Sequence, residues 1–152
     1  MRTLAALSLL LTLPACSLLG LDDEVPFTNV PQAEWLRLPE AGTAVFNDAA
    51  SWEAFWYDHT SASDSEGNPI PPPEIDFADK TAAAAFLGGG MSGCSNLARL
   101  VRSVSLDDDT AVVRVGRLEV EGGVTCDMLI SPVHVVTFEK AAAVRFVGEV
   151  PR

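Results

Sequence analysis

Cys16 is the residue whose surroundings most clearly predict a chemistry. It ends a segment in which Arg2 is the only charged residue, and residues 3–15 are uncharged and rich in Leu and Ala. A positive start, an apolar run and small residues before a cleavage point are the parts of a signal peptide. The run is shorter than the ~20 apolar residues of a membrane-spanning helix. Residues 1–15 are therefore predicted to direct export and to be removed.

The residues at this cleavage point resemble a lipobox. The segment Leu13-Pro14-Ala15-Cys16 is similar to bacterial lipoprotein signals, in which the Cys is acylated and becomes the new N-terminus. The resemblance implies that Cys16 anchors the chain by lipid in the cell envelope, outside the cytosol. Ser17, in place of Asp, resembles lipoproteins sent to the outer membrane where the host has one. An ordinary secretory signal cut nearby and an uncut membrane anchor are the alternatives.

Residues 16–31 are predicted to be the acylated N-terminus and a flexible tether. Acidic residues at 22–24 favour solvation, and Pro26 and Pro31 disfavour a helix or a central strand. The remaining residues, 32–152, are enough for one compact domain with its own core.

The other two cysteines, Cys94 and Cys126, are predicted to form a disulfide if Cys16 carries lipid. Such a pair is usually oxidised outside the cytosol. Closing a loop of about 33 residues would stabilise the fold by roughly 3–4 kcal/mol on the chain-entropy model. Two free buried thiols and a metal site are the alternatives, and the lack of a nearby His pair disfavours zinc.

Few other residues favour catalysis. The two histidines are His59 and His134, and His134 lies in an apolar segment typical of a structural histidine. No Gly-x-Ser-x-Gly motif frames a nucleophile, and no Lys-Ser or Lys-Thr follows the glycines at 88–90 to make a phosphate loop. The acidic run at 107–109 is a weak Ca²⁺ candidate, because calcium needs six or more oxygen ligands. We therefore expect no enzyme, no metal site and no cofactor.

The charge of the chain is strongly acidic. It has 21 Asp and Glu against 10 Lys and Arg, a formal net charge of −11. Nucleic-acid binding is disfavoured, because no basic stripe is present to neutralise phosphates.

The pattern of apolar residues predicts a mainly β fold: an antiparallel sheet, small sandwich or partly open barrel of about seven strands with one short helix. Alanine-rich residues 81–87 are predicted as a strand because the run is short and ends in glycines, and Gly116 is predicted to mark a β-bulge. The expected strands are 33–39, 43–46, 81–87, 97–106, 110–120, 128–139 and 144–150.

One helix is predicted over residues 49–58. Asp48 is a good N-cap, and Trp52, Phe55 and Trp56 share a face that would pack on a sheet. The following residues, 59–73, have no apolar period and include three consecutive prolines. A loop this long is uncommon, so it is expected to be either mobile or a contact surface.

The chain also resembles a known family. Ser51-Trp52-Glu53-Ala54-Phe55-Trp56, Ile75-Asp76-Phe77, Ala85-Phe86-Leu87-Gly88, Met91-Ser92-Gly93-Cys94 and Ser131-Pro132-Val133-His134-Val135-Val136 follow the order and spacing of the PrcB C-terminal domain family. The likeness covers roughly residues 45–140. It implies a lipoprotein accessory subunit of a bacterial cell-surface protease complex. This chain has Ser92-Gly93-Cys94 where the family has a Gly-Gly-Tyr-like turn.

A glycine-rich loop is the predicted interaction element. Its residues are Gly88, Gly89, Gly90, Met91, Ser92 and Gly93. Glycines allow backbone angles closed to other residues, and a disulfide at Cys94 would pin one end of the loop. A turn that only needs glycine for its shape is the alternative.

These observations favour a lipid-anchored, non-catalytic protein-binding domain of the cell envelope. The expected partner is a protein, in particular an exported protease that the domain assists or stabilises. A loop-type protease inhibitor is the alternative, since an ordered loop binds at little entropic cost. An enzyme of unknown type that uses His134 is a third interpretation.

Overall fold

The structure is a computed structural model that describes residues 23–93, 99–117 and 128–150. In chain order its elements are β1 (Asp23–Val25), β2 (Thr28–Asn29), the 3₁₀ helix η1 (Ala33–Trp35), β3 (Ala41–Phe46), α1 (Ala49–His59), β4 (Lys80–Leu87), β5 (Met91–Gly93), β6 (Val101–Asp107), β7 (Thr110–Val115), β8 (Met128–Ile130), β9 (Val133–Glu139) and β10 (Ala143–Gly148).

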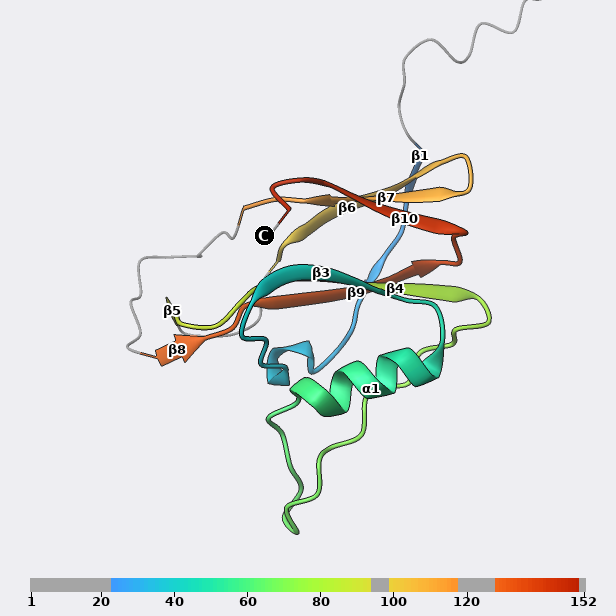
Figure 1. The fold of residues 1–152 in the computed structure, drawn as a ribbon. Helices are drawn as coiled ribbons and strands as arrows, with labels where there is room; N and C mark the ends of the chain where they lie inside the picture. The colour runs from blue at the N-terminus through green and yellow to red at the C-terminus, as the bar shows by residue number, and fades with distance from the viewer. Residues whose placement is uncertain (1–22, 94–98, 118–127, 151–152) are drawn as a thin grey trace, which may run out of the picture.

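Two four-stranded sheets stack face to face, and α1 covers the outer face of one of them (Figure 1). The first sheet has the order β1-β6-β7-β10, the second has the order β2-β9-β4-β3, and β5 and β8 form a separate pair. This arrangement confirms the predicted mainly β fold, a small sandwich with one short α-helix in the described part of the chain. The sheets do not close into a barrel over these residues.

Strand β4 explains why a run of alanines folds as a strand here. Ala83 and Ala85 pack in the core between the two sheets, whereas Ala82 and Ala84 pack under α1, and all four side chains are 0% exposed. A strand that is buried on both faces has no polar alternation. Small side chains on both faces let α1 and the first sheet approach the second sheet closely, and this packing overrides the helix propensity of Ala.

Helix α1 forms as the sequence predicts. The carboxylate of Asp48 accepts a hydrogen bond of 2.8 Å from the backbone N–H of Ser51, which caps the first turn. Trp52 and Trp56 are buried against the second sheet, and Phe55 is half-buried beside them. The apolar face of α1 therefore completes a second core on the outer side of that sheet.

The N-terminal strands correct the predicted tether. Residues of β1 pair antiparallel with β6 in the first sheet, and residues of β2 pair antiparallel with β9 in the second. Val30 is buried just after them. The described half of the 16–31 segment is therefore part of the domain, because edge-strand pairing to both sheets outweighs the solvation of its acidic residues.

Residues 33–39 do not form the predicted strand. They begin with η1, and only Leu36 makes an isolated bridge, to Thr60. Leu36 and Leu38 are buried, and Trp35 is half-buried and packs against the same core. Strand β3 begins at Ala41, two residues before the predicted strand over 43–46.

The C-terminal strands differ from the prediction in two ways. The single strand expected over 128–139 is divided into β8 and β9 by Ser131 and Pro132, and the carbonyl of Pro132 accepts a hydrogen bond from Leu87 N–H. The last strand, β10, pairs parallel with β7, although antiparallel neighbours were expected. The described residues contain ten strands, more than the predicted seven, because several are only two or three residues long.

The predicted bulge is on the opposite strand. The register of β6 against β7 shifts between Val101 and Ser103, which places the extra residue at Arg102. Gly116 lies just past β7, and a Cβ there would be 2.5 Å from Nε of Arg102. The absence of a side chain at 116 leaves room for the Arg102 side chain of the bulge, which lies against it.

Candidate functional site

The three cysteines lie outside the described residues. Acylation of Cys16 and the bridge between Cys94 and Cys126 therefore stay predictions. The described residues nearest to Cys94 and Cys126 do lie close together. Gly93, just before Cys94, is the antiparallel partner of Met128 in β8. This pairing brings the segments that lead to both thiols side by side.

The glycine-rich interaction loop is shorter than predicted. Gly88 has a φ of 77° and is buried, and a Cβ there would be 2.9 Å from both the backbone N of Ala41 and the carbonyl carbon of Glu40. Gly88 is therefore required by packing. Gly90 has a φ of 87°, and a Cβ there would meet no atom within 4 Å, so only its backbone angle requires glycine.

The second half of the same loop is a strand. Met91, Ser92 and Gly93 form β5 and pair in register with Ile130, Leu129 and Met128 of β8. The loop proper is thus Gly88 to Gly90, a turn between β4 and β5. This finding corrects the expectation that all six residues form a loop, while their role as an interaction element stays a prediction.

His134 joins the two sheets. Its Nδ1 accepts a hydrogen bond of 2.9 Å from the backbone N–H of Val101, and its Nε2 lies 2.9 Å from Oδ1 of Asn29. These partners need a neutral ring with its proton on Nε2. Burial lowers the pKa of His134 to about 4, with the positive charges of Arg99 and Arg102 adding to the effect. The imidazole is 4% exposed and both of its nitrogens are engaged, which is the geometry of a structural residue.

The other polar candidates also have structural roles. His59 is in the last turn of α1, where its ring meets Phe55 edge to face with centroids 4.8 Å apart. Asp107 ends β6 and pairs with Arg145 of β10 at 3.2 Å. Over the described residues, no group of three or more His, Cys, Asp and Glu side chains is placed to hold a metal ion.

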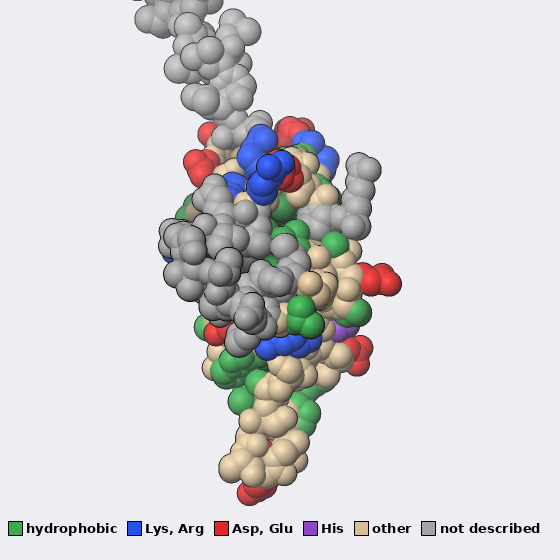
Figure 2. Space-filling view, turned by 90° about the vertical axis from the view of Figure 1, so that its left-hand side faces the viewer, with side chains coloured by type: hydrophobic (Ala, Val, Ile, Leu, Met, Phe, Trp, Pro, Cys, Tyr) green, Lys and Arg blue, Asp and Glu red, His purple; other side chains and the backbone are tan. Residues whose placement is uncertain are grey.

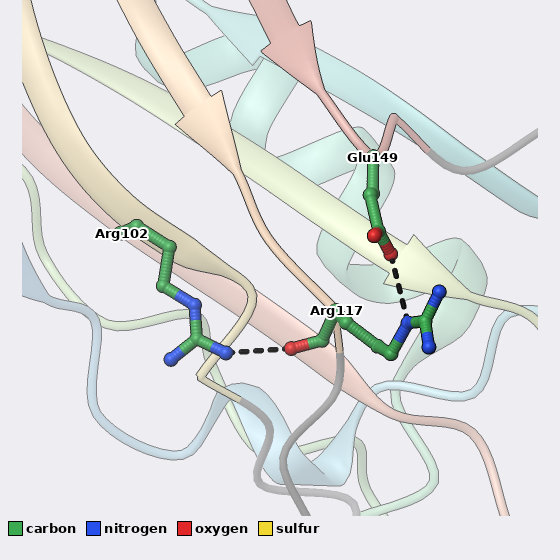
Figure 3. A network of polar contacts seen from close by, with 3 residues as sticks. All are labelled: Arg102, Arg117 and Glu149. Carbon is green, nitrogen blue, oxygen red and sulfur yellow. Dashed lines mark hydrogen bonds and ion pairs between the residues drawn. The ribbon is translucent and has the colours of Figure 1, made fainter.

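A polar network ties the ends of three strands of the first sheet (Figure 3). The guanidinium of Arg102 donates a 2.6 Å hydrogen bond to the carbonyl of Arg117, whose Nε in turn lies 3.2 Å from a carboxylate oxygen of Glu149. The side chains of Arg117 and Glu149 are 82% and 57% exposed. Exposed ion pairs of this kind contribute little to stability.

The segment between α1 and β4 contains the most distinctive surface feature. Residues 61–70, which we call the finger, extend from the helix side of the domain, away from the first sheet (Figure 1). Figure 2 shows them as a narrow projection with an acidic side chain at its tip. All side chains from Ser63 to Pro69 are exposed. The finger is thus a convex surface that contributes almost nothing to either core.

The base of the finger is held on both sides. On the first arm, the backbone N–H and the hydroxyl of Ser61 each donate a 2.9 Å hydrogen bond to the carbonyl of Trp35. On the second arm, the indole N–H of Trp56 donates a 2.7 Å hydrogen bond to the carbonyl of Ile70. The indole of Trp52 binds the carbonyl of Pro73 in the same way at 3.0 Å. The finger is therefore fastened to the buried face of α1.

Asp64 organises the tip of the finger. Its Oδ1 accepts hydrogen bonds from the backbone N–H groups of Glu66 and Asn68, at 2.8 and 2.9 Å, and its Oδ2 accepts from the Asn68 amide at 3.2 Å. The hydrogen bonds from Asn68 lower the pKa of Asp64. Gly67 closes the turn with a φ of 85°. Backbone hydrogen bonds pair the arms, from Ile70 N–H to the carbonyl of Ala62 and from Asp64 N–H to the carbonyl of Asn68.

The sequence indicated only part of this feature. It predicted a loop over 59–73, and the structure has a loop there that contains a hydrogen-bonded turn; its role as a contact surface stays a prediction. The Asp64-Ser65-Glu66-Gly67-Asn68 pattern is the signal that favours such a turn, because Asp side chains cap nearby N–H groups and Gly allows a positive φ. The two indole hydrogen bonds join residues that are far apart in the sequence, so no local sequence pattern predicts them.

A groove of about 540 Å³ lies next to β2, on the same side of the second sheet as α1. Its walls include Asn29, Gln32 and Ile75. Gln32 has a φ of 63°, which is uncommon for a residue other than glycine. Asn29 is already engaged by His134, and the lining also includes the charged residues Glu74, Asp76 and Lys80.

Within the described residues, no helix is both long enough and apolar enough to cross a membrane. In comparisons with known proteins, no protein-family model, no curated protein and no solved structure matches this chain.

Proposed function

We propose that this chain is a lipid-anchored, non-catalytic protein-binding domain of the cell envelope. Cys16 would hold it by lipid on the outer side of a membrane, and its partner would be an exported protease that it assists or stabilises. The likeness of residues 45–140 to the PrcB C-terminal domain family supports this choice of partner. The observation that carries the binding role is the finger, which is ordered by hydrogen bonds although it is almost fully exposed.

Conformational entropy opposes the ordering of an exposed segment such as the finger. Fixing the backbone of one residue costs roughly 1–2 kcal/mol, and burial in a core normally offsets that cost. The finger buries very little, so its order depends on Asp64 at the tip and on Trp52 and Trp56 at the base. A segment ordered before binding loses less entropy when a partner docks, which raises affinity.

The same observation favours a second candidate, a loop-type protease inhibitor. A narrow, braced hairpin is the shape that enters a protease cleft without further ordering. In this case the partner would also be a protease, but binding would block its substrate. The two candidates therefore predict the same complex and differ in the activity of that complex.

The experiment uses the purified soluble form, residues 17–152, with a panel of serine and cysteine proteases. Binding is measured by biolayer interferometry and turnover with a peptide substrate. Binding without loss of turnover supports the accessory role, and dose-dependent loss supports inhibition. If no protease of the panel binds at micromolar concentrations of the domain, the proposed class of partner is wrong.

A further inference from the structure

We propose that β3 is a docking edge, to which an extended segment of another polypeptide, free of acidic residues, adds as a further strand of the second sheet. This inference goes beyond the proposed function, because β3 and the finger are different surfaces of the domain. Strand β3 (Ala41–Phe46) ends the order of the second sheet, with β4 on one side and no described strand on the other (Figure 1).

Half of the backbone hydrogen-bonding groups of β3 point away from β4. The N–H of Leu87 in β4 donates to the carbonyl of Pro132, so Leu87 bonds toward β9. Successive residues of an antiparallel strand bond to opposite neighbours, and therefore the even-numbered residues of β4 bond to the even-numbered residues of β3. The odd-numbered residues of β3, among them Thr43 and Val45, direct their N–H and C=O groups outward, where the described chain supplies no partner.

The other edges of the two four-stranded sheets are protected against such pairing. Natural proteins protect an edge strand by short length, charge, proline or a bulge. Strand β1 has three residues with two carboxylates, β2 has two residues, and β10 carries the exposed Arg145. By contrast, β3 has six residues without charge or proline, and its register with β4 runs without a bulge. Over the described residues, β3 is therefore the edge that is open to a further strand.

An exposed apolar side chain lies on the same edge. Val45 is 37% exposed and is one of three large apolar residues exposed in the described part of the chain. It lies opposite Ala83, whose side chain packs between the two sheets, so Val45 is on that face of β3. An added strand would bond to the backbone of Thr43 and Val45 and cover the Val45 side chain with one of its own. Backbone pairing then gives affinity, and Val45 favours an apolar or β-branched neighbour.

Charge at the two ends of β3 disfavours a second copy of this chain as the occupant. Glu40 precedes the strand and Asp48 lies just past its end, and both are exposed. Hydrogen bonds from Ser51 lower the pKa of Asp48, which keeps this carboxylate ionised. Two antiparallel copies of β3 would place Glu40 of one near Asp48 of the other at both ends, and like charges oppose such pairing. A segment with Lys, Arg or no charge at its ends avoids this repulsion.

The test uses the soluble form, residues 17–152, which keeps every described strand, and three synthetic peptides. The first is a short peptide of alternating Thr and Val with Lys at both ends, and the second has Glu at both ends instead. The third is the Lys-ended peptide with N-methyl groups on its central amides, which block pairing along either edge. Amide exchange of the domain is measured residue by residue by NMR. Without peptide, Thr43 and Val45 should exchange at least about tenfold faster than Ala44 and Phe46.

We expect the Lys-ended peptide, at ~1 mM, to slow exchange at Thr43 and Val45 at least about tenfold. The Glu-ended peptide should slow it less, and the methylated peptide should have no effect. An equal effect of all three peptides, or none from the Lys-ended peptide, would refute the docking edge.

A pair of variants tests the same edge from the side of the domain. Thr43→Pro removes the outward N–H but no bond to β4, and should weaken binding of the Lys-ended peptide at least about tenfold. Thr43→Val keeps the N–H and should leave the affinity unchanged. Equal affinities for the two variants would contradict the proposal. The methylated peptide makes the corresponding comparison on the unaltered chain, whether or not Thr43→Pro folds.

The remaining outcomes separate this inference from the proposed function. Slow exchange at Thr43 and Val45 without peptide, together with a dimer in sedimentation, would replace the partner with a second copy and overturn the inference. Peptide effects confined to residues 61–70 would overturn the docking edge and leave binding by the finger. Failure of every protease in the panel to bind would overturn the proposed function and leave the docking edge.

Discussion

The indole N–H of Trp56 lies 2.7 Å from the carbonyl oxygen of Ile70, so a fully buried helix residue holds an exposed hairpin in place. Trp56→Phe keeps an aromatic ring but removes the donor and some volume. We expect the free energy of unfolding to fall by roughly 2–3 kcal/mol and amide exchange in the finger to accelerate. Denaturant unfolding and hydrogen-exchange mass spectrometry measure the two effects.

The control for this substitution is Tyr57→Phe on the exposed side of α1, where the ring is 49% exposed. It should change stability by less than about 0.5 kcal/mol and leave exchange in the finger unchanged. If Trp56→Phe lowers stability while exchange in the finger stays as slow as before, the indole hydrogen bond does not order the finger.

Alanine substitutions at Gly88 and Gly90 distinguish the cost of a packing clash from the cost of an unfavourable backbone angle. Both have a positive φ, but only at Gly88 would an added Cβ lie 2.9 Å from backbone atoms. Gly90→Ala should cost about 1 kcal/mol for its backbone angle alone. Gly88→Ala should lower the free energy of unfolding by at least ~2 kcal/mol more than Gly90→Ala does, since it also displaces the start of β3. Equal costs in urea unfolding would show that position 88 is not packed against β3.

Because His134 is buried as a neutral ring, we expect the stability of the fold to depend on pH. Its pKa is lowered from 6.5 to about 4, first by burial and then by Arg99 and Arg102. The unfolded state therefore binds a proton more readily than the folded state does. The stability contributed by neutral His134 is fully present above pH 6.5 and is lost as the pH falls toward 4, an effect on the order of 3 kcal/mol.

An NMR titration of the imidazole protons of His134 checks this directly. The account predicts a midpoint near 4 in the folded protein. A midpoint at 6.5 or above would mean that the ring is hydrated and that the hydrogen bonds to Val101 and Asn29 do not hold it neutral.

The predicted acylation of Cys16 and the predicted disulfide each change the mass of the intact protein. Purified from its host, the chain should begin at Cys16, carry a diacylglycerol, and weigh two hydrogens less than its reduced form because Cys94 and Cys126 are joined. Intact-mass analysis with and without reductant measures both features. An unacylated, uncleaved product would contradict the anchor, and labelling of both thiols without reductant would contradict the bridge.

The parts of the fold that local patterns determine could be predicted from the sequence. Asp48 followed by apolar residues at helical spacing predicts α1, and the alternating residues of β6 and β7 predict a hairpin around 107–109. The strand at β4 was also predicted, from its length and its glycine boundary. Each of these elements has its signal within about ten residues of the chain.

The parts that long-range contacts determine could not be predicted. Acidic residues and prolines favoured a tether at 16–31, but β1 and β2 pair with strands more than 70 residues away. The parallel pairing of β10 with β7 and the division of β8 from β9 likewise depend on where other strands lie. The finger is ordered by Trp52 and Trp56, whose indoles reach residues 21 and 14 positions along the chain.

We expect the finger to be ordered before any partner binds. Backbone ¹⁵N relaxation of the isolated domain measures this most directly. The account predicts order parameters near ~0.85 for residues 64–68, similar to those of the strands, with a decrease in Trp56→Phe. Values below ~0.6 across these residues in the unaltered protein would contradict it.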